Sequence, residues 1–271
     1  MEPVLDCVFI ETTTACTRRC HFCTHHYIDI VPHFMNEGLF LRIIDELGAM
    51  DFSGRLAFYM NGEPLLDRRL ERWLTIAKRH CPRALNFINT NGDLLTTERA
   101  TSLFQAGLDA MKVNSYSQKA AEKLVRLKHE LPDPQRRKIH HADASAFTGW
   151  SSRGGVVKGG AEREGRYPGL LCPRPFRQLY ITVTGRVALC CTDDQCWHPM
   201  GDANVDRLAD IWNGPDFAAV RAGFHRGGPV PSLCYRCDLD PGYQEVSEVR
   251  TLFSQGDSQD SPRPTERSGT G

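Results

Sequence analysis

Segments typical of β-strands and of α-helices alternate along the first half of this chain. Short apolar runs that predict buried strands occupy residues 4–12, 54–60, 84–90, 109–115 and 136–142. Between them, apolar residues recur at helical spacing in residues 36–50, 66–80, 96–107 and 118–131. Such an alternation indicates parallel strands that share one sheet, with the connecting helices packed outside it. We therefore predict an α/β fold for this part of the chain.

Three cysteines, Cys16, Cys20 and Cys23, lie in the loop after the first predicted strand, in the sequence CTRRCHFC. Ligands of parallel sheets gather at the carboxyl ends of the strands, so this loop lies where a ligand would bind. A tetrahedral metal ion or a cubane cluster needs four ligands. Three thiolates therefore leave one position open, which either a distant cysteine or a molecule other than protein must fill.

The chain contains eleven cysteines among 271 residues, and their meaning depends on the cellular compartment. We expect a cytoplasmic protein, because the first fifteen residues lack a secretory signal and no apolar run is long enough to span a membrane. Cytosolic thiols stay reduced, so clustered cysteines indicate metal or cluster ligands rather than disulfides. Lys+Arg and Asp+Glu both number 33, and this lack of a basic excess argues against a nucleic-acid binder.

The second half of the chain changes in composition. Residues 149–169 are rich in glycine and charge and predict a connecting or substrate segment. Residues 176–191 predict a β-hairpin, and residues 205–224 predict one or two helices. The last residues are polar without an apolar pattern, so we expect them to be disordered. These changes divide the chain into four parts: residues 1–148, 149–169, 170–250 and 251–271.

A second set of cysteines lies in the third of these parts and comprises Cys172, Cys190, Cys234 and Cys237. Four thiolates in one small module can close a tetrahedral zinc site or hold a complete [4Fe–4S] cluster. The spacing alone leaves both kinds of site open.

The motif Cys16-x3-Cys20-x2-Cys23, with Phe22 before its last cysteine, resembles the signature of the radical S-adenosylmethionine (SAM) superfamily. The resemblance implies that these cysteines hold a [4Fe–4S] cluster whose fourth iron binds the amino and carboxylate groups of SAM. SAM would then fill the open position. The resemblance also implies a partial (β/α)6 barrel as the fold of the core.

Other segments at predicted strand ends are similar to the SAM-binding segments of this superfamily. The sequence YMNGEP resembles the stretch that contacts the methionine amino group, which implies that Gly62 lets the backbone approach the ligand and that Glu63 offers its carboxylate to the ammonium. The sequences NTNGD and NS end the third and fourth strands, where related enzymes hold the ribose and methionine of SAM. Asn91 and Asn114 are therefore candidate SAM contacts, although turn chemistry alone also explains the NGD sequence.

The pattern Cys…Gly-x4-Cys…Cys-x2-Cys, downstream of such a core, resembles the shortened SPASM, or twitch, domain. This resemblance implies a small C-terminal β-hairpin and helix iron–sulfur domain. It also implies that Cys172, Cys190, Cys234 and Cys237 hold a single auxiliary [4Fe–4S] cluster, since no cysteine follows Cys237.

The segments DFSGRLAFYMNGEPLL, PRALNFINTNGDLLT and SSRGG resemble a narrower family, the aminocyclitol dehydrogenases of the butirosin type and the epimerases that tailor other aminoglycosides. In these dehydrogenases the arginine of the SSRGG stretch assists loss of the hydroxyl proton, which implies that role for Arg153. Asn61 and Asn89 stand where the dehydrogenase has tyrosines, implying a different or larger sugar. Cys191 replaces an aromatic residue. Because successive strand side chains point to opposite faces, Cys191 would turn away from the cluster of Cys190 and face the substrate as a hydrogen-atom donor.

The resemblance implies a radical SAM enzyme acting on an aminoglycoside or aminocyclitol, with SAM and two [4Fe–4S] clusters as cofactors and a flavodoxin- or ferredoxin-type reductant. We expect an epimerase that removes a carbinol hydrogen and returns one from Cys191. The alternative is a dehydrogenase that forms a ketone and passes an electron to the auxiliary cluster. One rival is a peptide-modifying maturase, but such enzymes usually carry an N-terminal peptide-binding domain and only fifteen residues precede Cys16. Another is a non-catalytic zinc- or cluster-binding module.

Overall fold

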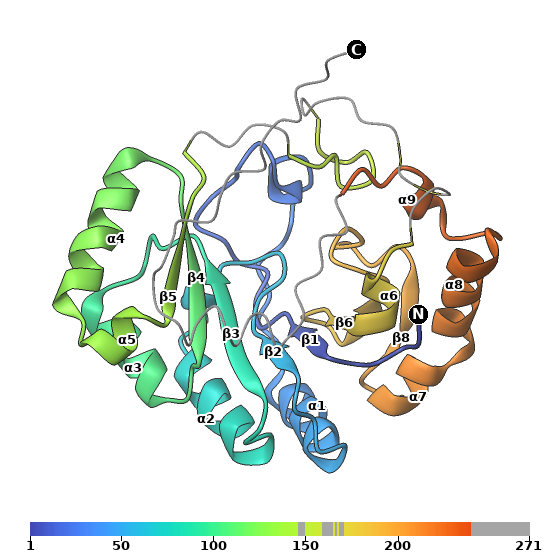
Figure 1. The fold of residues 1–271 in the computed structure, drawn as a ribbon, viewed down its shortest axis with the longest axis horizontal. Helices are drawn as coiled ribbons and strands as arrows, with labels where there is room; N and C mark the ends of the chain where they lie inside the picture. Colours follow the sequence, from blue (N-terminus) through green and yellow to red (C-terminus); the bar gives the residue numbers. More distant parts are fainter. Residues whose placement is uncertain (146–149, 159–164, 166, 168–170, 240–271) are drawn as a thin grey trace.

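The computed structural model of this chain describes residues 1–145, 150–158, 165, 167 and 171–239. In this part, eight strands form one sheet in the order β5-β4-β3-β2-β1-β6-β7-β8 (Figure 1). The strands are β1 (Cys7–Ile10), β2 (Arg55–Ala57), β3 (Leu85–Thr90), β4 (Ala110–Ser115), β5 (Ile139–Asp143), β6 (Gln178–Ile181), β7 (Arg186–Ala188) and β8 (Pro199–Asp202). Neighbouring strands from β5 to β6 are parallel, whereas β6, β7 and β8 pair antiparallel.

The helices follow the strands as the sequence predicts. The longer ones are α1 (Glu37–Ala49), α2 (Leu70–His80), α3 (Thr97–Gln105), α4 (Gln118–Glu130), α7 (Leu208–Asn213) and α8 (Pro215–Arg226). Short helical segments are η1 (Thr24–His26), η2 (Pro64–Leu66), α5 (Asp133–Arg136), α6 (Arg174–Arg177) and α9 (Ser232–Tyr235). The predicted α/β fold, with its parallel core and C-terminal hairpin, is confirmed.

The sixth parallel strand comes from the predicted hairpin. β6 pairs in parallel with β1, so that Phe9 lies opposite Tyr180, and the C-terminal module extends the core sheet. All four residues of β6 are buried. A strand that is buried on both faces needs cover from both sides, which a hairpin standing alone cannot provide. The sheet stays open, because β5 and β8 lie at its two edges.

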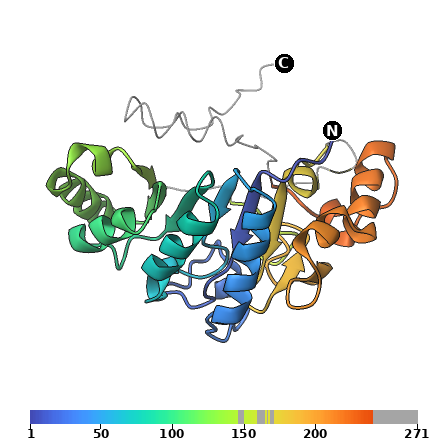
Figure 2. The same ribbon diagram turned by 90° about the horizontal axis from the view of Figure 1, so that it is seen from below.

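The two faces of the sheet have different cover. On one face, strand residues such as Val8 and Ile88 pack against α1 to α4 and the C-terminal helices in one large apolar core, in which the rings of Phe40 and Trp73 lie 4.3 Å apart. The strands form an arch with helices along its outer side (Figure 2). The inner face carries a smaller cluster that includes Phe9 and Tyr180.

Helix α2 starts later than predicted. The expected start was residue 66, but residues 64–66 form η2 and the helix begins at Leu70. The reason is the buried Asp67, which accepts hydrogen bonds from Trp73 Nε1 at 3.0 Å and from Arg69 N at 3.0 Å. An aspartate that caps backbone and side-chain donors in this way favours a turn over a helix interior.

Part of the predicted connecting segment contacts the cysteine loop. Trp150 packs against His21, and Tyr27 Oη donates to Lys158 O at 2.9 Å. These residues therefore cover the cysteine loop. The predicted disordered tail, residues 251–271, lies outside the described residues. Within the described residues, no helix combines the length and apolar character needed to cross a membrane.

Candidate active site

The cysteine loop brings its three thiols together above the carboxyl ends of the strands. It connects β1 to α1 and contains η1 directly after Cys23. Burial raises the pKa of the Cys16 and Cys20 thiols, and the nearby Cys23 thiol raises both further. Three thiols that influence one another in this way form a ready ligand set once they lose their protons.

The end of β2 is fastened to the cysteine loop. Glu63 N donates to Ala15 O at 2.7 Å. A Cβ atom on Gly62 would lie only 2.1 Å from Thr13 O, so no other residue fits without a shift of the backbone. The sequence assigned Gly62 to a close approach of a ligand. In the structure, its close neighbour is the backbone that leads into the cysteine loop.

The carboxylate of Glu63 joins the ends of β2 and β3. Its Oε1 accepts from Thr90 Oγ1 at 2.6 Å and from Leu65 N at 3.0 Å, and its Oε2 accepts from Asn91 N at 2.8 Å. Burial raises the pKa of Glu63, while these donors lower it. A carboxylate oxygen can accept two hydrogen bonds, so Oε2 keeps one acceptor position beyond the contacts of the described residues.

Asn91 and Asn114 line one pocket of about 920 Å³ of empty space beside α4. The Asn91 Nδ2 donates to Thr17 Oγ1 at 2.9 Å and lies 3.9 Å from Cys16 Sγ, so this side chain touches the cysteine loop. Asn114 Nδ2 donates to Asn89 Oδ1 at 2.7 Å. The two predicted SAM contacts are therefore neighbours, as a shared ligand would require.

An ion pair that the sequence analysis did not single out closes one side of this pocket. Arg18 lies between Cys16 and Cys20, and its Nη2 donates to Asp93 Oδ1 at 2.5 Å. The guanidinium also lies 5.1 Å from the centre of the Tyr116 ring. Arg18 thereby holds the cysteine loop against the ends of β3 and β4. The one sign of this ion pair in the sequence was the NGD turn, to which Asp93 belongs.

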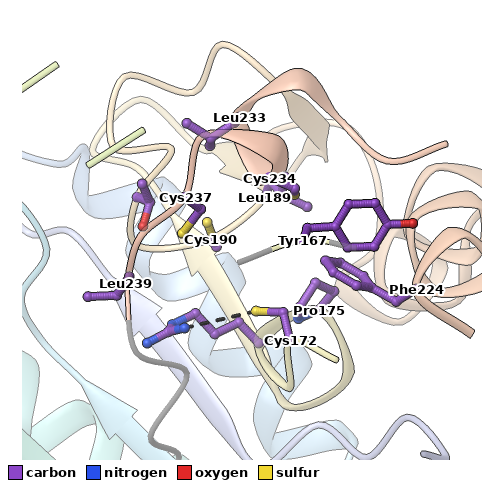
Figure 3. A pocket seen from close by; sticks show the side chains of 12 residues that line it. Tyr167, Cys172, Pro175, Leu189, Cys190, Phe224, Leu233, Cys234, Cys237 and Leu239 are labelled. Carbon is purple, nitrogen blue, oxygen red and sulfur yellow. Dashed lines mark hydrogen bonds between the residues drawn. The ribbon is translucent and has the colours of Figure 1, made fainter. Parts of the chain in front are cut away.

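The second set of cysteines surrounds one apolar pocket. Cys172, Cys190, Cys234 and Cys237 line it together with Leu189, Leu233 and Phe224 (Figure 3). Burial, with a smaller effect of Cys172 and Cys237, raises the pKa of Cys234 to about 12, and burial raises that of Cys190 well above its usual range.

The donor set of this pocket fits an iron–sulfur cluster. A cubane cluster is held by four cysteine thiolates, each bound to a different iron. Four thiols line this one pocket, and its apolar lining provides the hydrophobic shell that controls solvent access to such a site.

Arg153 is held in a fixed and uncommon backbone conformation. Its φ of 47° lies in the left-handed region, which a non-glycine residue adopts at a cost and which often marks functional sites. The buried Asp238, directly after Cys237, accepts hydrogen bonds from Ser151 Oγ at 2.6 Å and from Ser152 N at 2.9 Å. The residue after Cys237 thus anchors the segment that carries Arg153.

The structure brings the two predicted catalytic residues, Arg153 and Cys191, together. Arg153 Nη1 donates to Cys191 O at 3.2 Å. The Cys191 side chain packs against the inner-face cluster that contains Phe9 and Tyr180, and it is close enough to Tyr180 to raise that residue's pKa further, beyond the effect of burial. Cys190 packs against the same inner-face cluster as Cys191, and it is the one of the two that also lines the cysteine pocket.

Two buried carboxylates near these residues were missed by the sequence analysis. Glu11 follows β1, and its Oε1 accepts from Asn61 N at 3.2 Å while its Oε2 accepts from Val183 N at 2.9 Å. Asp194 lies close to Arg153, with 3.9 Å between Asp194 Oδ2 and Arg153 Nη1. An acidic residue at the end of an apolar strand, and the acidic pair after Cys191, were the available signals in the sequence.

Glu11 makes the stability of the protein depend on pH. Burial raises its pKa to about 7, above the ordinary value of about 4.3. The folded protein then binds a proton between these two values that the unfolded chain has released, so stability falls as the pH rises through this window. We expect a loss of about 3 kcal/mol between pH 4 and pH 8, which Glu11→Gln removes. Anaerobic unfolding curves across this range measure the difference in slope, and parallel curves for the two proteins would contradict the prediction.

Comparisons with known proteins agree with this geometry. Residues 10–128 match the radical SAM superfamily, and residues 172–238 match the SPASM family, an iron–sulfur cluster-binding domain. The S-adenosyl-L-methionine-dependent 2-deoxy-scyllo-inosamine dehydrogenase of Niallia circulans is 27% identical over 240 residues, covering 88% of this chain and 94% of that protein. The tungsten-containing aldehyde ferredoxin oxidoreductase cofactor-modifying protein of Pyrococcus furiosus is 29% identical over 132 residues, covering 49% of this chain and 36% of that protein.

Solved structures agree as well. The crystal structure of BtrN in complex with AdoMet and 2-DOIA superposes with a TM-score of 0.77 at 27% identity, covering 88% of this chain and 95% of that one. The structure of BtrN in an open conformation superposes with a TM-score of 0.68 at 24% identity, covering 92% of this chain and 99% of that one. At this identity the likeness supports the fold alone. The cofactors are SAM, the cluster of the radical SAM domain and an auxiliary iron–sulfur cluster. The chain is a radical SAM enzyme with a C-terminal SPASM-type iron–sulfur domain.

Proposed function

We propose that this enzyme oxidises a carbinol of an aminocyclitol, or of a sugar derived from one, to a ketone. The observation that carries the proposal is its likeness to an aminocyclitol dehydrogenase along nearly the whole length of that protein, 94%. The likeness extends to the structure that contains both AdoMet and 2-DOIA. The sequence favoured an epimerase, with dehydrogenation as the alternative. The comparisons support the alternative better.

The cysteines are assigned to the two clusters by their surroundings. Cys16, Cys20 and Cys23 hold the cluster that binds SAM, with Glu63, Asn91 and Asn114 around the SAM site. Cys172, Cys190, Cys234 and Cys237 hold the auxiliary cluster in the apolar pocket. When bound, SAM and its cluster supply the 5′-deoxyadenosyl radical that removes a hydrogen atom. The auxiliary cluster supplies the acceptor for the remaining electron. A flavodoxin- or ferredoxin-type protein is the proposed reductant.

Residues of the chain itself orient the substrate and assist the loss of its hydroxyl proton. Arg153 projects from its strained turn with 37% of its side chain exposed, so its guanidinium is available to a substrate oxygen. Its contact with Cys191 O keeps it next to the loop that follows β7. Asn61 Nδ2 donates to Asp194 O at 2.9 Å and so faces the same loop. Asn61 and Asn89 stand where the dehydrogenases have tyrosines, which supports a different or larger substrate.

Epimerisation remains the second candidate because of Cys191. Its side chain packs against the inner-face cluster that contains Phe9 and Tyr180, and it is not among the residues that line the pocket of the other C-terminal cysteines. A thiol in that position is placed to return a hydrogen atom to a carbon radical. The result would be inversion of the carbinol carbon rather than a ketone.

Turnover in D2O separates the two reactions. With SAM, a reductant and a panel of aminocyclitols and aminoglycosides, we expect one ketone for each 5′-deoxyadenosine, without solvent deuterium in recovered substrate. We also expect Cys191→Ala to leave ketone formation intact. Mass spectrometry and NMR of the product make the measurement.

The opposite outcome is equally distinct. An inverted carbinol carrying one solvent deuterium, lost in Cys191→Ala while 5′-deoxyadenosine still forms, would replace the dehydrogenase assignment by an epimerase. Formation of 5′-deoxyadenosine in both proteins ensures that the comparison concerns the fate of the substrate radical and not SAM cleavage.

A further inference from the structure

Asp194 connects the parts of the chain that build the proposed active site. Its side chain is only 1% exposed. Asp194 Oδ2 accepts from Thr24 Oγ1 at 2.5 Å, and Thr24 directly follows the last cysteine of the cysteine loop. The same oxygen lies 3.9 Å from Arg153 Nη1. Asp194 therefore lies between the cysteine loop and the arginine that faces the substrate.

Arg153 needs such a partner if it handles a proton. An arginine stays protonated in proteins because its pKa exceeds about 12, so its guanidinium cannot take up a further proton. It can receive the proton of a substrate hydroxyl only while it passes one of its own protons to another group. A carboxylate behind the guanidinium is the chemical group suited to receive it.

The other buried carboxylates of this region are engaged elsewhere. Asp193 accepts from the backbone amides of Leu189, Trp197 and His198 at 2.9 to 3.2 Å. Both oxygens of Glu11 accept backbone amides. Asp194 is the carboxylate for which an ion pair with Arg153 is seen in the described part of the chain. Burial raises its pKa, while Arg153, Thr24 and Gln195 lower it.

We propose that Asp194 is the proton acceptor that acts through Arg153 in the dehydrogenation, an inference that rests on the proposed function. With the cofactors bound, SAM and its cluster would supply the acceptor for the carbinol hydrogen atom, and the auxiliary cluster would supply the acceptor for one electron. The hydroxyl proton moves to the guanidinium as the guanidinium releases a proton to Asp194 Oδ2, once the 3.9 Å between Arg153 Nη1 and this oxygen closes to hydrogen-bond distance. The C=O bond forms as the C–H and O–H bonds break. Asp194 ends protonated, Arg153 is unchanged, and the substrate has lost two hydrogens and gained none.

Asp194→Asn tests this relay because it keeps the shape of the side chain and an acceptor for Thr24 but cannot take the proton. We expect ketone formation to fall about 100-fold, as for loss of a general base, while 5′-deoxyadenosine formation continues. Asp194→Glu, which retains a carboxylate, should recover part of the ketone. Arg153→Gln should lower the ketone by a similar factor, and the double variant should lose little more, because both residues serve one step.

Asp193→Asn is the matched control, since it neutralises the adjacent buried carboxylate, which binds backbone amides. We expect it to lower the unfolding temperature without changing the ratio of ketone to 5′-deoxyadenosine. Unfolding temperatures and iron contents of all variants identify any that fail to fold. An unchanged ratio in Asp194→Asn, or additive losses in the double variant, would overturn the relay alone. No ketone from the wild-type enzyme would overturn the proposed function and the relay with it.

Discussion

Alanine at Cys16, Cys20 or Cys23 is expected to abolish the formation of 5′-deoxyadenosine from SAM. Each substitution removes one of three thiolates from the loop that the radical SAM match includes. The remaining two cannot hold a cluster with a single open iron, because no further thiolate lies in this loop. The product is measured by chromatography after anaerobic incubation with SAM and a strong reductant.

Cys81→Ala is the matched control for this experiment. Cys81 is buried in the main apolar core, where its thiol lies 3.8 Å from Ile44 O, and it belongs to neither cysteine set. We expect SAM cleavage to persist in this variant, with a modest loss of stability from the removed sulfur. Wild-type amounts of 5′-deoxyadenosine from any of the three loop variants would refute their assignment as cluster ligands.

Replacing both Cys234 and Cys237 by alanine is expected to remove about one cluster, or about four irons, from the reconstituted protein. The C-terminal module should also become less stable, since metal binding contributes directly to the folding of such sites. The double substitution removes two of the four thiols of the pocket, and without a cluster its apolar lining is exposed. SAM cleavage should continue, but ketone formation should stop because the electron acceptor is gone. Iron and sulfide analysis, together with product analysis, makes the measurement.

Cys196→Ala supplies the control within the same module. Cys196 is buried and packs against the inner-face cluster, and it does not line the cysteine pocket. We expect this variant to keep the full iron content. If the double variant retained both clusters, the auxiliary ligands would have to be sought among other residues.

Much of the fold was predictable because burial leaves a local trace in the sequence. The predicted helices 36–50 and 118–131 match α1 and α4 to within one residue at each end. The side chains of Asn36 and Ser117 cap these helices and fix where they begin. Both cysteine sets were also visible, because Cys16-x3-Cys20-x2-Cys23 and Cys234-x2-Cys237 have the short spacings typical of metal or cluster ligands. Local periodicity shows which residues must be buried, but not which distant segment covers them. The pairing of β6 with β1 therefore escaped prediction, although the hairpin itself did not.

The amino-acid sequence by itself determined the strand and helix alternation and the two sets of thiols, and its resemblance to radical SAM enzymes indicated their cofactors. Only the tertiary structure decided which side chains lie together in the proposed active site. Thr24 and Asp194 are 170 residues apart, and their hydrogen bond leaves no periodic pattern. Asp238 reaches back 87 residues to Ser151 to set the turn of Arg153. A single carboxylate gives no indication of its partner until the chain has folded, because the energy of an ion pair or hydrogen bond depends on distance in space and not along the sequence.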